Sequence, residues 1–231
     1  MNKTDELSLR LKSIANLITP GNRMADIGTD HAFLPIYLVK NHICPSALAM
    51  DLREGPLSIA EEHIKDAGLS DRIETRLSDG LNDYKPGETE TIVIAGMGGD
   101  LIADILKRGS KAGSLSEKPE LVLSPHTKAY EVRKELCNIG YRITEETVLK
   151  DDGKYYILIK ANVSDEDPVL SEKQLQYGPE MIKKKDPLFL EYLNRQLKIK
   201  KDILEGMPLE NKERTEELKH DISVIEEVLR G

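Results

Sequence analysis

The feature that most constrains the fold is a repeated alternation of short apolar segments with helix-like segments along the first two thirds of the chain. The apolar segments predict five strands, at residues 23–28, 46–51, 72–77, 91–95 and 120–123. The other segments predict helices at residues 7–18, 33–40, 56–67, 100–107 and 128–138, with Asp100 as an N-cap. Because parallel strands need crossover connections, this order predicts a doubly wound α/β sheet with helices on both faces.

Two further strands follow, at residues 141–150 and 154–161. The turn Asp151-Asp152-Gly153 between them is typical of a β-hairpin. This hairpin would add an antiparallel strand to the end of the sheet. By the alternation of side chains along a strand, either Tyr155 or Tyr156 should face the ligand cleft.

Residues 164–231 differ in composition from the rest of the chain. The acidic loop Ser164-Asp165-Glu166-Asp167-Pro168 comes first, and strand-forming sequences are almost absent beyond it. Apolar residues then recur at heptad spacing in two runs, separated by Gly206-Met207-Pro208: Leu190, Leu193, Leu197 and Leu204, then Leu218, Ile222, Ile225 and Leu229. This pattern predicts a coiled-coil hairpin of two antiparallel helices. We therefore expect an α/β domain at residues 1–163 and a helical domain at residues 164–231.

Charge is unevenly distributed over the two predicted helices. Residues 181–201 contain seven Lys or Arg against two acidic residues, a net charge of +5, whereas residues 202–231 have a net charge of −5. Complementarity between paired helices explains this pattern, and so does a basic surface for nucleic-acid phosphates. The sequence leaves both explanations open. The candidate phosphate-binding residues are Lys183, Lys184, Lys185 and Arg195.

Bulk composition narrows the functional class. A net charge of −8 argues against a protein that coats nucleic acid through its overall charge. Without an apolar run of about 18 residues or a signal sequence, the chain is expected to be cytoplasmic, with no membrane contact. Cys44 and Cys137 should be free thiols, and no Cys or His pair has metal-ligand spacing, so no metal is expected. The oligomeric state stays open, with a monomer slightly favoured.

Candidate binding residues follow the predicted strands, at the edge where open α/β sheets bind their ligands. Gly28 allows close approach of the backbone to a ligand, although Asp26-Ile27-Gly28-Thr29-Asp30-His31 lacks the glycine fingerprint of dinucleotide-binding folds. A capped tight turn is the alternative. Asp51, followed by Leu52, can bind both hydroxyls of a ribose or can cap the next helix.

The third and fourth strand ends add to this pattern. Ser78-Asp79-Gly80 provides a carboxylate that can accept a hydrogen bond from the amine of adenine, or that serves only the turn. Gly96-Met97-Gly98-Gly99 exposes backbone carbonyls to an amine, and Met97 can pack against a flat base; a structural glycine turn is the alternative. Together the four strand ends describe a site for an adenosyl ligand without phosphates.

The same segments resemble a known family. The chain is similar over essentially its whole length to the bacterial tRNA (adenine-22, N1)-methyltransferases, through Leu7-Ser8-Leu9-Arg10-Leu11, Ala25-Asp26-Ile27-Gly28-Thr29-Asp30-His31, Ser78-Asp79-Gly80-Leu81 and Ile94-Ala95-Gly96-Met97-Gly98-Gly99. The resemblance implies a Rossmann-like seven-stranded class I methyltransferase domain with strand order 3-2-1-4-5-7-6, followed by the coiled-coil hairpin. It also implies S-adenosyl-L-methionine as cofactor, tRNA as partner, and methyl transfer to N1 of adenine 22.

The resemblance assigns roles to the strand-end residues. The expected cofactor-binding residues are Asp26, Gly28, Asp30, Asp51, Leu52, Ser78, Asp79, Gly80 and Gly96. The expected catalytic group is Asp30, His31, Gly96 and Met97. Backbone near Gly96 would aim adenine N1, and Asp30 would bind cofactor or stabilise the cationic product. His31 would position a ligand or serve the structure, and Arg10 would join the hairpin's basic residues in contacting RNA phosphates.

Other functions remain compatible with the residues. One is a methyltransferase that acts on a protein or a small molecule, which the net negative charge favours. Another is a non-catalytic module that binds the cofactor and uses the coiled coil for interaction. A nicotinamide dehydrogenase is a distant alternative, because the glycine fingerprint is missing.

Overall fold

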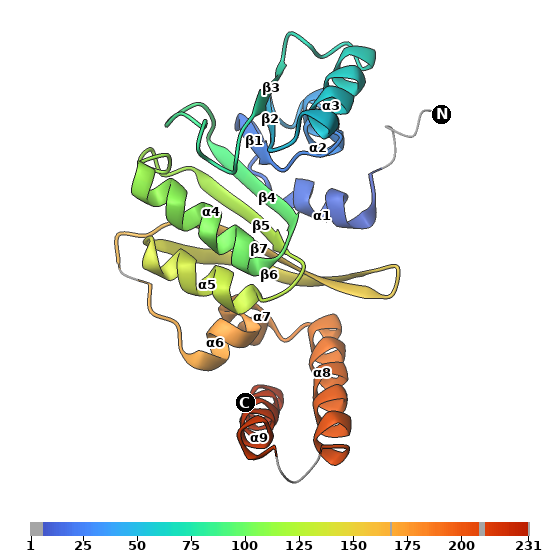
Figure 1. The fold of residues 1–231 in the computed structure, drawn as a ribbon, viewed down its shortest axis with the longest axis vertical. Coiled ribbons are helices and arrows are strands. Elements are labelled where there is room, and N and C mark those ends of the chain that lie inside the picture. Colours follow the sequence, from blue (N-terminus) through green and yellow to red (C-terminus); the bar gives the residue numbers. More distant parts are fainter. Residues whose placement is uncertain (1–6, 167, 208–210, 231) are drawn as a thin grey trace.

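The computed structural model describes residues 7–166, 168–207 and 211–230, and a seven-stranded sheet forms its centre (Figure 1). The strands are β1 Met24–Ile27, β2 Ala47–Asp51, β3 Ile73–Leu77, β4 Thr91–Met97, β5 Glu120–Pro125, β6 Tyr141–Asp151 and β7 Lys154–Val163. Their order is β3-β2-β1-β4-β5-β7-β6. Strand β7 is antiparallel to both of its neighbours, and the other pairs are parallel. This order confirms the arrangement that the family resemblance implies.

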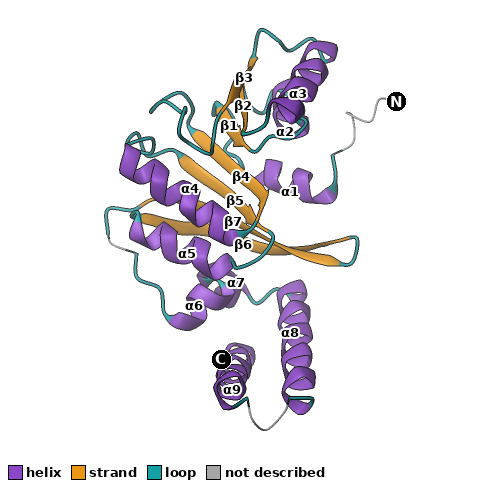
Figure 2. Ribbon diagram, viewed as in Figure 1, coloured by secondary structure: helices purple, strands orange, loops and turns teal. Residues whose placement is uncertain are grey.

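Helices cover both faces of the sheet (Figure 2). One hydrophobic cluster joins the first three helices to one face, and a second joins the next two helices to the other. These helices are α1 Leu9–Leu17, α2 Phe33–Lys40, α3 Glu54–Asp66, α4 Gly99–Ala112 and α5 Ala129–Asn138. Because both faces are covered, every residue of β1 and β2 is buried, which explains their nearly continuous apolar sequences.

The end of β4 departs from regular strand geometry. The pairing of β4 with β5 shifts between Ala95 and Met97, and Gly96 at this bulge has a φ of +83°. Only glycine adopts this conformation without steric cost, and bulges of this kind re-aim the chain beside active sites. The predicted N-cap Asp100 is wrong, because α4 begins one residue earlier, at Gly99. A side chain at Gly99 would collide with the backbone of Thr127 and Lys128, so close packing of two segments sets this helix start.

In the described part of the chain, four helices follow the sheet: α6 Glu172–Tyr177, α7 Pro179–Lys184, α8 Pro187–Glu205 and α9 Lys212–Arg230. The last two are the predicted helical pair. Helices α6 and α7 were not predicted, because six residues are too few to show a helical period. Of the predicted loops, Asp167 and Pro208 lie outside the described residues.

A third hydrophobic cluster holds α8 and α9 together, with α8 packed against β6 and α9 against α6. The heptad prediction correctly placed part of this core, whereas Phe189 and Val228 were not in the pattern. The charges of the two helices also pair: Lys200 lies 2.5 Å from Asp221, and Lys201 lies 2.8 Å from Glu226. In the described ranges, no helix is both long and apolar enough to cross a membrane.

A buried ion pair joins this helical region to the sheet. Arg133 of α5 donates through Nε to Glu146 of β6 at 2.7 Å, and both side chains are fully buried. The same guanidinium donates to the backbone carbonyls of Leu175 and Gln176 at 2.8 and 3.0 Å. A β-carbon at Gly178 would collide with the Glu146 carboxylate. One arginine therefore connects α5, β6 and the end of α6.

Candidate active site

A cavity of about 530 Å³ opens at the carboxyl edge of the sheet. It is lined by the ends of β1, β2, β3 and β4, as the positions of the sequence motifs predicted. All of the expected cofactor-binding and catalytic residues line it: Asp26, Gly28, Asp30, His31, Asp51, Leu52, Ser78, Asp79, Gly80, Gly96 and Met97. The turns that follow four separate strands therefore all contribute residues to one cavity.

The turn after β1 forms the floor of the cavity. Gly28 has a φ of +78°, and a β-carbon there would collide with the Met97 side chain. Asp26 is buried and accepts a hydrogen bond from the hydroxyl of Thr29 at 2.9 Å. Burial raises the pKa of Asp26 to about 6, against the opposing effect of the Thr29 hydrogen bond. Asp26 is therefore a carboxylate whose charge changes just below neutral pH.

Asp51 at the end of β2 is buried, with its carboxylate held by the backbone. The amide of Arg53 donates to Oδ1 at 2.9 Å, and the amide of Asp30 donates to Oδ2 at 3.3 Å. A carboxylate oxygen has two lone pairs, so each can still accept a bond from a hydroxyl. The next residue, Leu52, is 63% exposed although it is apolar, and it offers a flat apolar wall to a ligand.

The turn after β3 has two polar side chains with different surroundings. The hydroxyl of Ser78 is buried, donates to the carbonyl of Gly80 at 3.0 Å and accepts from the amide of Asp83, so it shapes the turn. Asp79 is half exposed and pairs with Arg108 of α4 at 3.1 Å. The sequence reasoning missed Arg108, which is 29 residues away along the chain.

Asp30 and His31 lie side by side at the cavity mouth. Asp30 has a left-handed backbone with a φ of 55°, and its carboxylate lies 3.6 Å from Nε2 of His31. The His31 ring also lies beside Phe33 and His63. Its Nδ1 atom is buried and has no hydrogen-bond partner among the described residues. A buried polar atom without a partner costs free energy, so the orientation of this ring is set by its neighbours rather than by a hydrogen bond at Nδ1.

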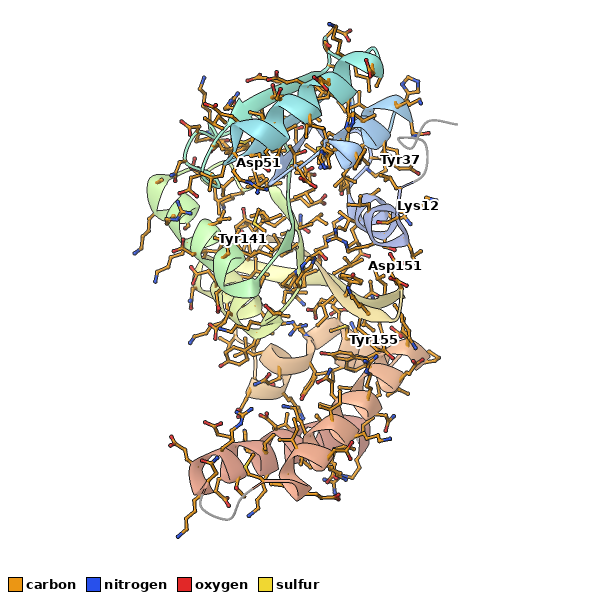
Figure 3. The ribbon with its side chains drawn as sticks, turned by 45° about the vertical axis from the view of Figure 1, so that its right-hand side comes forward. Lys12, Tyr37, Asp51, Tyr141, Asp151 and Tyr155 are labelled. Carbon is orange, nitrogen blue, oxygen red and sulfur yellow. The ribbon has the colours of Figure 1, made fainter. Side chains whose placement is uncertain are left out.

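Arg10 and His126 close the cavity next to Gly96, with Tyr156 behind them. The sequence reasoning placed neither Arg10 nor His126 there, whereas Tyr156 was one of the two tyrosines expected at the cleft. Arg10 and His126 line the cavity, and Nη1 of Arg10 lies 3.3 Å from Nε2 of His126. The Arg10 guanidinium also lies over the ring of Tyr156, 5.5 Å from its centroid. Of the two tyrosines considered for the cleft, Tyr156 therefore lies on the cavity side. Tyr155 instead packs against Tyr192 of α8 and lies toward the C-terminal helices in Figure 3.

The basic residues of the C-terminal region lie apart from this cavity. Lys183, Lys184 and Lys185 lie at the end of α7, and they form no ion pair within the described part of the chain. Arg195 of α8 lies over the ring of Tyr155 at 5.3 Å and donates to the carbonyl of Gly153. Lys183 lines a separate pocket near the start of β6, whereas Arg195 lies at the β6–β7 turn, so none of these residues is part of the strand-end site.

The residues of the cavity fit S-adenosyl-L-methionine. Four carboxylates line it, and they suit the hydroxyls, amines and positive charge of an adenosyl sulfonium rather than the phosphates of a dinucleotide. The glycine at position 28 leaves room that a side chain would fill. No group of His, Cys, Asp or Glu arranged to hold a metal ion occurs among the described residues.

The family model for tRNA (adenine(22)-N(1))-methyltransferase, TrmK, matches residues 24–227. The chain belongs to this family. A tRNA (adenine(22)-N(1))-methyltransferase of Bacillus subtilis (strain 168) is 36% identical over 233 residues, which cover 97% of each chain. The match therefore spans the α/β sheet and the C-terminal helices together.

Solved structures of the family agree with this assignment. The B. subtilis m1A22 tRNA methyltransferase TrmK has a TM-score of 0.86 at 35% identity, covering 96% of this chain and 98% of that chain. TrmK of M. capricolum, in complex with the cofactor product S-adenosyl-homocysteine, has a TM-score of 0.85 at 31% identity and covers 96% of each chain. The resemblance stated from the sequence is thus confirmed.

Proposed function

We propose that the chain transfers the methyl group of S-adenosyl-L-methionine to N1 of adenine 22 in tRNA, and that the transfer takes place in the strand-end cavity. The observation that carries this proposal is the convergence of four strand-end motifs on one acidic cavity, in a chain that matches the family over nearly its full length. The cofactor is S-adenosyl-L-methionine, and tRNA is the partner.

Within this proposal, the cofactor is bound by the residues that the sequence named. Asp51 accepts the ribose hydroxyls, since its two oxygens are already oriented by backbone amides. Leu52 and the Ser78-Asp79-Gly80 turn enclose the adenine ring of the cofactor. The sulfonium end of the cofactor would lie along the floor of the cavity, which is lined by Asp26, Gly28 and Asp30.

When bound, S-adenosyl-L-methionine supplies a methyl group that the lone pair of adenine N1 can take directly. The protein then has to orient the base and exclude water rather than remove a proton beforehand. Carbonyls at the β4 bulge, near Gly96, accept hydrogen bonds from the amine of the target base, and Met97 packs against its ring. The nearby carboxylates, Asp30 among them, stabilise the cationic product. His31 lines the cavity and positions a ligand there.

The helical region at residues 164–231 acts in this proposal as an RNA-holding domain for the catalytic domain at residues 1–163. A base that is paired or stacked must be flipped out before N1 can react, at a cost of a few kcal/mol. This cost would be offset in part by phosphate contacts from four basic residues: Lys183, Lys184, Lys185 and Arg195. We place the enzyme in the cytoplasm, where its tRNA substrate is found, and take a monomer as the working unit.

The test is a methylation assay with radiolabelled S-adenosyl-L-methionine and two tRNA transcripts that differ only at position 22. Label in the adenine-22 transcript and none in the guanine-22 transcript is the expected result. Label in both transcripts would overturn the position but keep the tRNA methyltransferase. Label in neither, with cofactor binding intact by calorimetry, would favour a protein or small-molecule acceptor, or a non-catalytic binding module.

A further inference from the structure

We infer that Arg10 binds a backbone phosphate of the target nucleotide itself, at the rim of the cavity beside Gly96, and is a positioning residue for the base. The inference rests on the proposed function and adds a phosphate subsite to it. The sequence already predicted that Arg10 contacts RNA phosphates, and the inference adds which nucleotide supplies the phosphate and where in the site it lies.

The geometry holds the guanidinium of Arg10 at the reacting end of the cavity. A β-carbon on Gly96 would lie 3.6 Å from Nη1 of Arg10. The backbone amide of Arg10 donates to the carboxylate of Asp151 at 3.3 Å, which ties α1 to the tip of the β6–β7 hairpin. Figure 3 shows Asp151 close to the part of α1 that includes Lys12.

Two aromatic side chains orient this guanidinium without neutralising it. The ring of Tyr156 lies under it, and His126 lies at its Nη1 atom. Burial, and then the charges of Arg10 and Lys154, lower the pKa of His126, so its ring is neutral at pH 7 and Nε2 can accept a hydrogen bond from Arg10. Since a guanidinium has five N–H donors, this bond leaves others for a ligand.

The charges of the cavity show why the ligand of Arg10 is an anion. The ionisable residues that line the cavity are four carboxylates, two arginines and two histidines. Arg53 lies 3.9 Å from Asp51 at the β2 end and is 72% exposed. Arg10 forms no ion pair with any carboxylate in the described ranges, although it lies at the mouth of an acidic cavity.

The cofactor brings a carboxylate but no phosphate to this site, whereas the target nucleotide brings a phosphate on each side. The carboxylates repel both phosphates from the floor of the cavity, where the base has to enter. An unpaired guanidinium at the rim is therefore the group that can receive one of them, and arginine matches phosphate geometry with paired hydrogen bonds. Binding a phosphate there would fix how far the base enters the cavity.

The experiment combines a protein variant with a change in the RNA. Arg10→Gln removes the charge and keeps a polar, though shorter, side chain. The RNA carries a neutral methylphosphonate at the 5′ or the 3′ phosphate of nucleotide 22. The affinities for unmodified and modified tRNA are measured with wild-type protein and with R10Q, which closes a double-mutant cycle. Lys12→Ala is the matched control, because Lys12 is an exposed cation on the same helix and does not line the cavity.

We expect R10Q to weaken tRNA binding about tenfold and to lower the salt dependence of binding by roughly one phosphate contact. One of the two methylphosphonates should weaken wild-type binding to a similar extent and should have little further effect on R10Q. Arg10→Lys should restore part of the affinity because it restores the charge. K12A should stay within about twofold of wild type.

Three outcomes would overturn the inference. Additive effects of R10Q with both methylphosphonates would show that Arg10 binds neither phosphate. A loss of S-adenosyl-L-methionine affinity in R10Q would place Arg10 in the cofactor site instead, and an unchanged salt dependence would show that its charge does not meet RNA. None of these measurements needs methylation, so they are independent of the assay for adenine 22. If wild-type protein fails that assay, the proposed function is wrong instead.

Discussion

The cavity and the C-terminal helices are held in place by different kinds of interaction. At the cavity, short turns position several of the polar side chains: Thr29 donates to Asp26, and the amide of Arg53 donates to Asp51. The helical region instead depends on Arg133, which reaches residues 13 to 43 positions away. Local turns thus shape much of the chemical site, whereas a buried long-range ion pair helps to attach the part that we propose to hold RNA.

The largest expected effect comes from breaking that long-range contact. Glu146→Ala leaves the guanidinium of Arg133 buried without its carboxylate, and removing one partner of a buried ion pair costs about 3–5 kcal/mol. The free energy of unfolding, measured by urea denaturation, should fall by this amount. The affinity for S-adenosyl-L-methionine in the absence of urea should stay within about twofold, because the strand-end turns are unchanged.

A matched control replaces the whole pair by apolar residues. Arg133→Met with Glu146→Leu leaves no buried charge, so it should recover most of the stability lost in E146A. A cost below about 1 kcal/mol for E146A would show that the pair does not anchor the helices. A parallel loss of cofactor affinity would show that the two regions are not separate in the way described above.

The same contrast explains what could be predicted from the sequence. The strands and the residues at their ends were found, because apolar alternation and turn-forming residues are local signals. Arg108 beside Asp79 and Arg10 beside His126 were missed, since no periodicity marks a contact between residues 29 or 116 positions apart. The predicted cap at Asp100 failed for a related reason: the start of α4 is set by its packing against Thr127 and Lys128.

The next largest effect is a difference in cofactor affinity between variants of two cavity carboxylates. Asp51→Ala should weaken S-adenosyl-L-methionine binding by about 100-fold or more, because hydrogen bonds to a charged group contribute about 1.5–3 kcal/mol each and two hydroxyls are involved. Asp79→Ala should have a smaller effect, of about tenfold or less, because Asp79 is half exposed and already paired with Arg108. Calorimetry measures both affinities. Equal losses would show that burial does not distinguish the two sites.

A smaller effect concerns the pH dependence at Asp26. Burial raises the pKa of Asp26 to about 6, so the group is mostly protonated at pH 5 and ionised at pH 7. The ionised form attracts the sulfonium, and S-adenosyl-L-methionine affinity should therefore rise up to about tenfold between these pH values. S-adenosyl-homocysteine lacks the sulfonium charge and should show a flatter profile. Asp26→Asn should flatten the profile of S-adenosyl-L-methionine as well, and an unchanged profile in this variant would exclude Asp26 as the titrating group.

The raised pKa of Asp26 also has a consequence for stability. The folded chain binds this proton more tightly than the unfolded chain does, so the contribution of Asp26 is present at low pH and is lost as pH rises through about 6. In the absence of cofactor, Asp26→Asn should therefore make the free energy of unfolding less dependent on pH between 4 and 6.

The smallest expected effect lies in the helical region. Lys183→Ala and Lys184→Ala each remove one exposed charge that has no ion-pair partner in the described ranges. If these lysines contact RNA phosphates, each change should weaken tRNA binding a few-fold and lower the slope of log Kd against log salt by about 0.7–0.9.

The control for this prediction is Lys111→Ala, because this exposed lysine lies at the end of α4 that is distant from the carboxyl edge of the sheet. Equal small effects for all three variants would mean that the net charge of the enzyme, rather than the surface at α7, governs RNA binding. A specific loss at Lys183 and Lys184, with cofactor affinity unchanged, would show that the two regions divide their tasks, one binding cofactor and the other RNA.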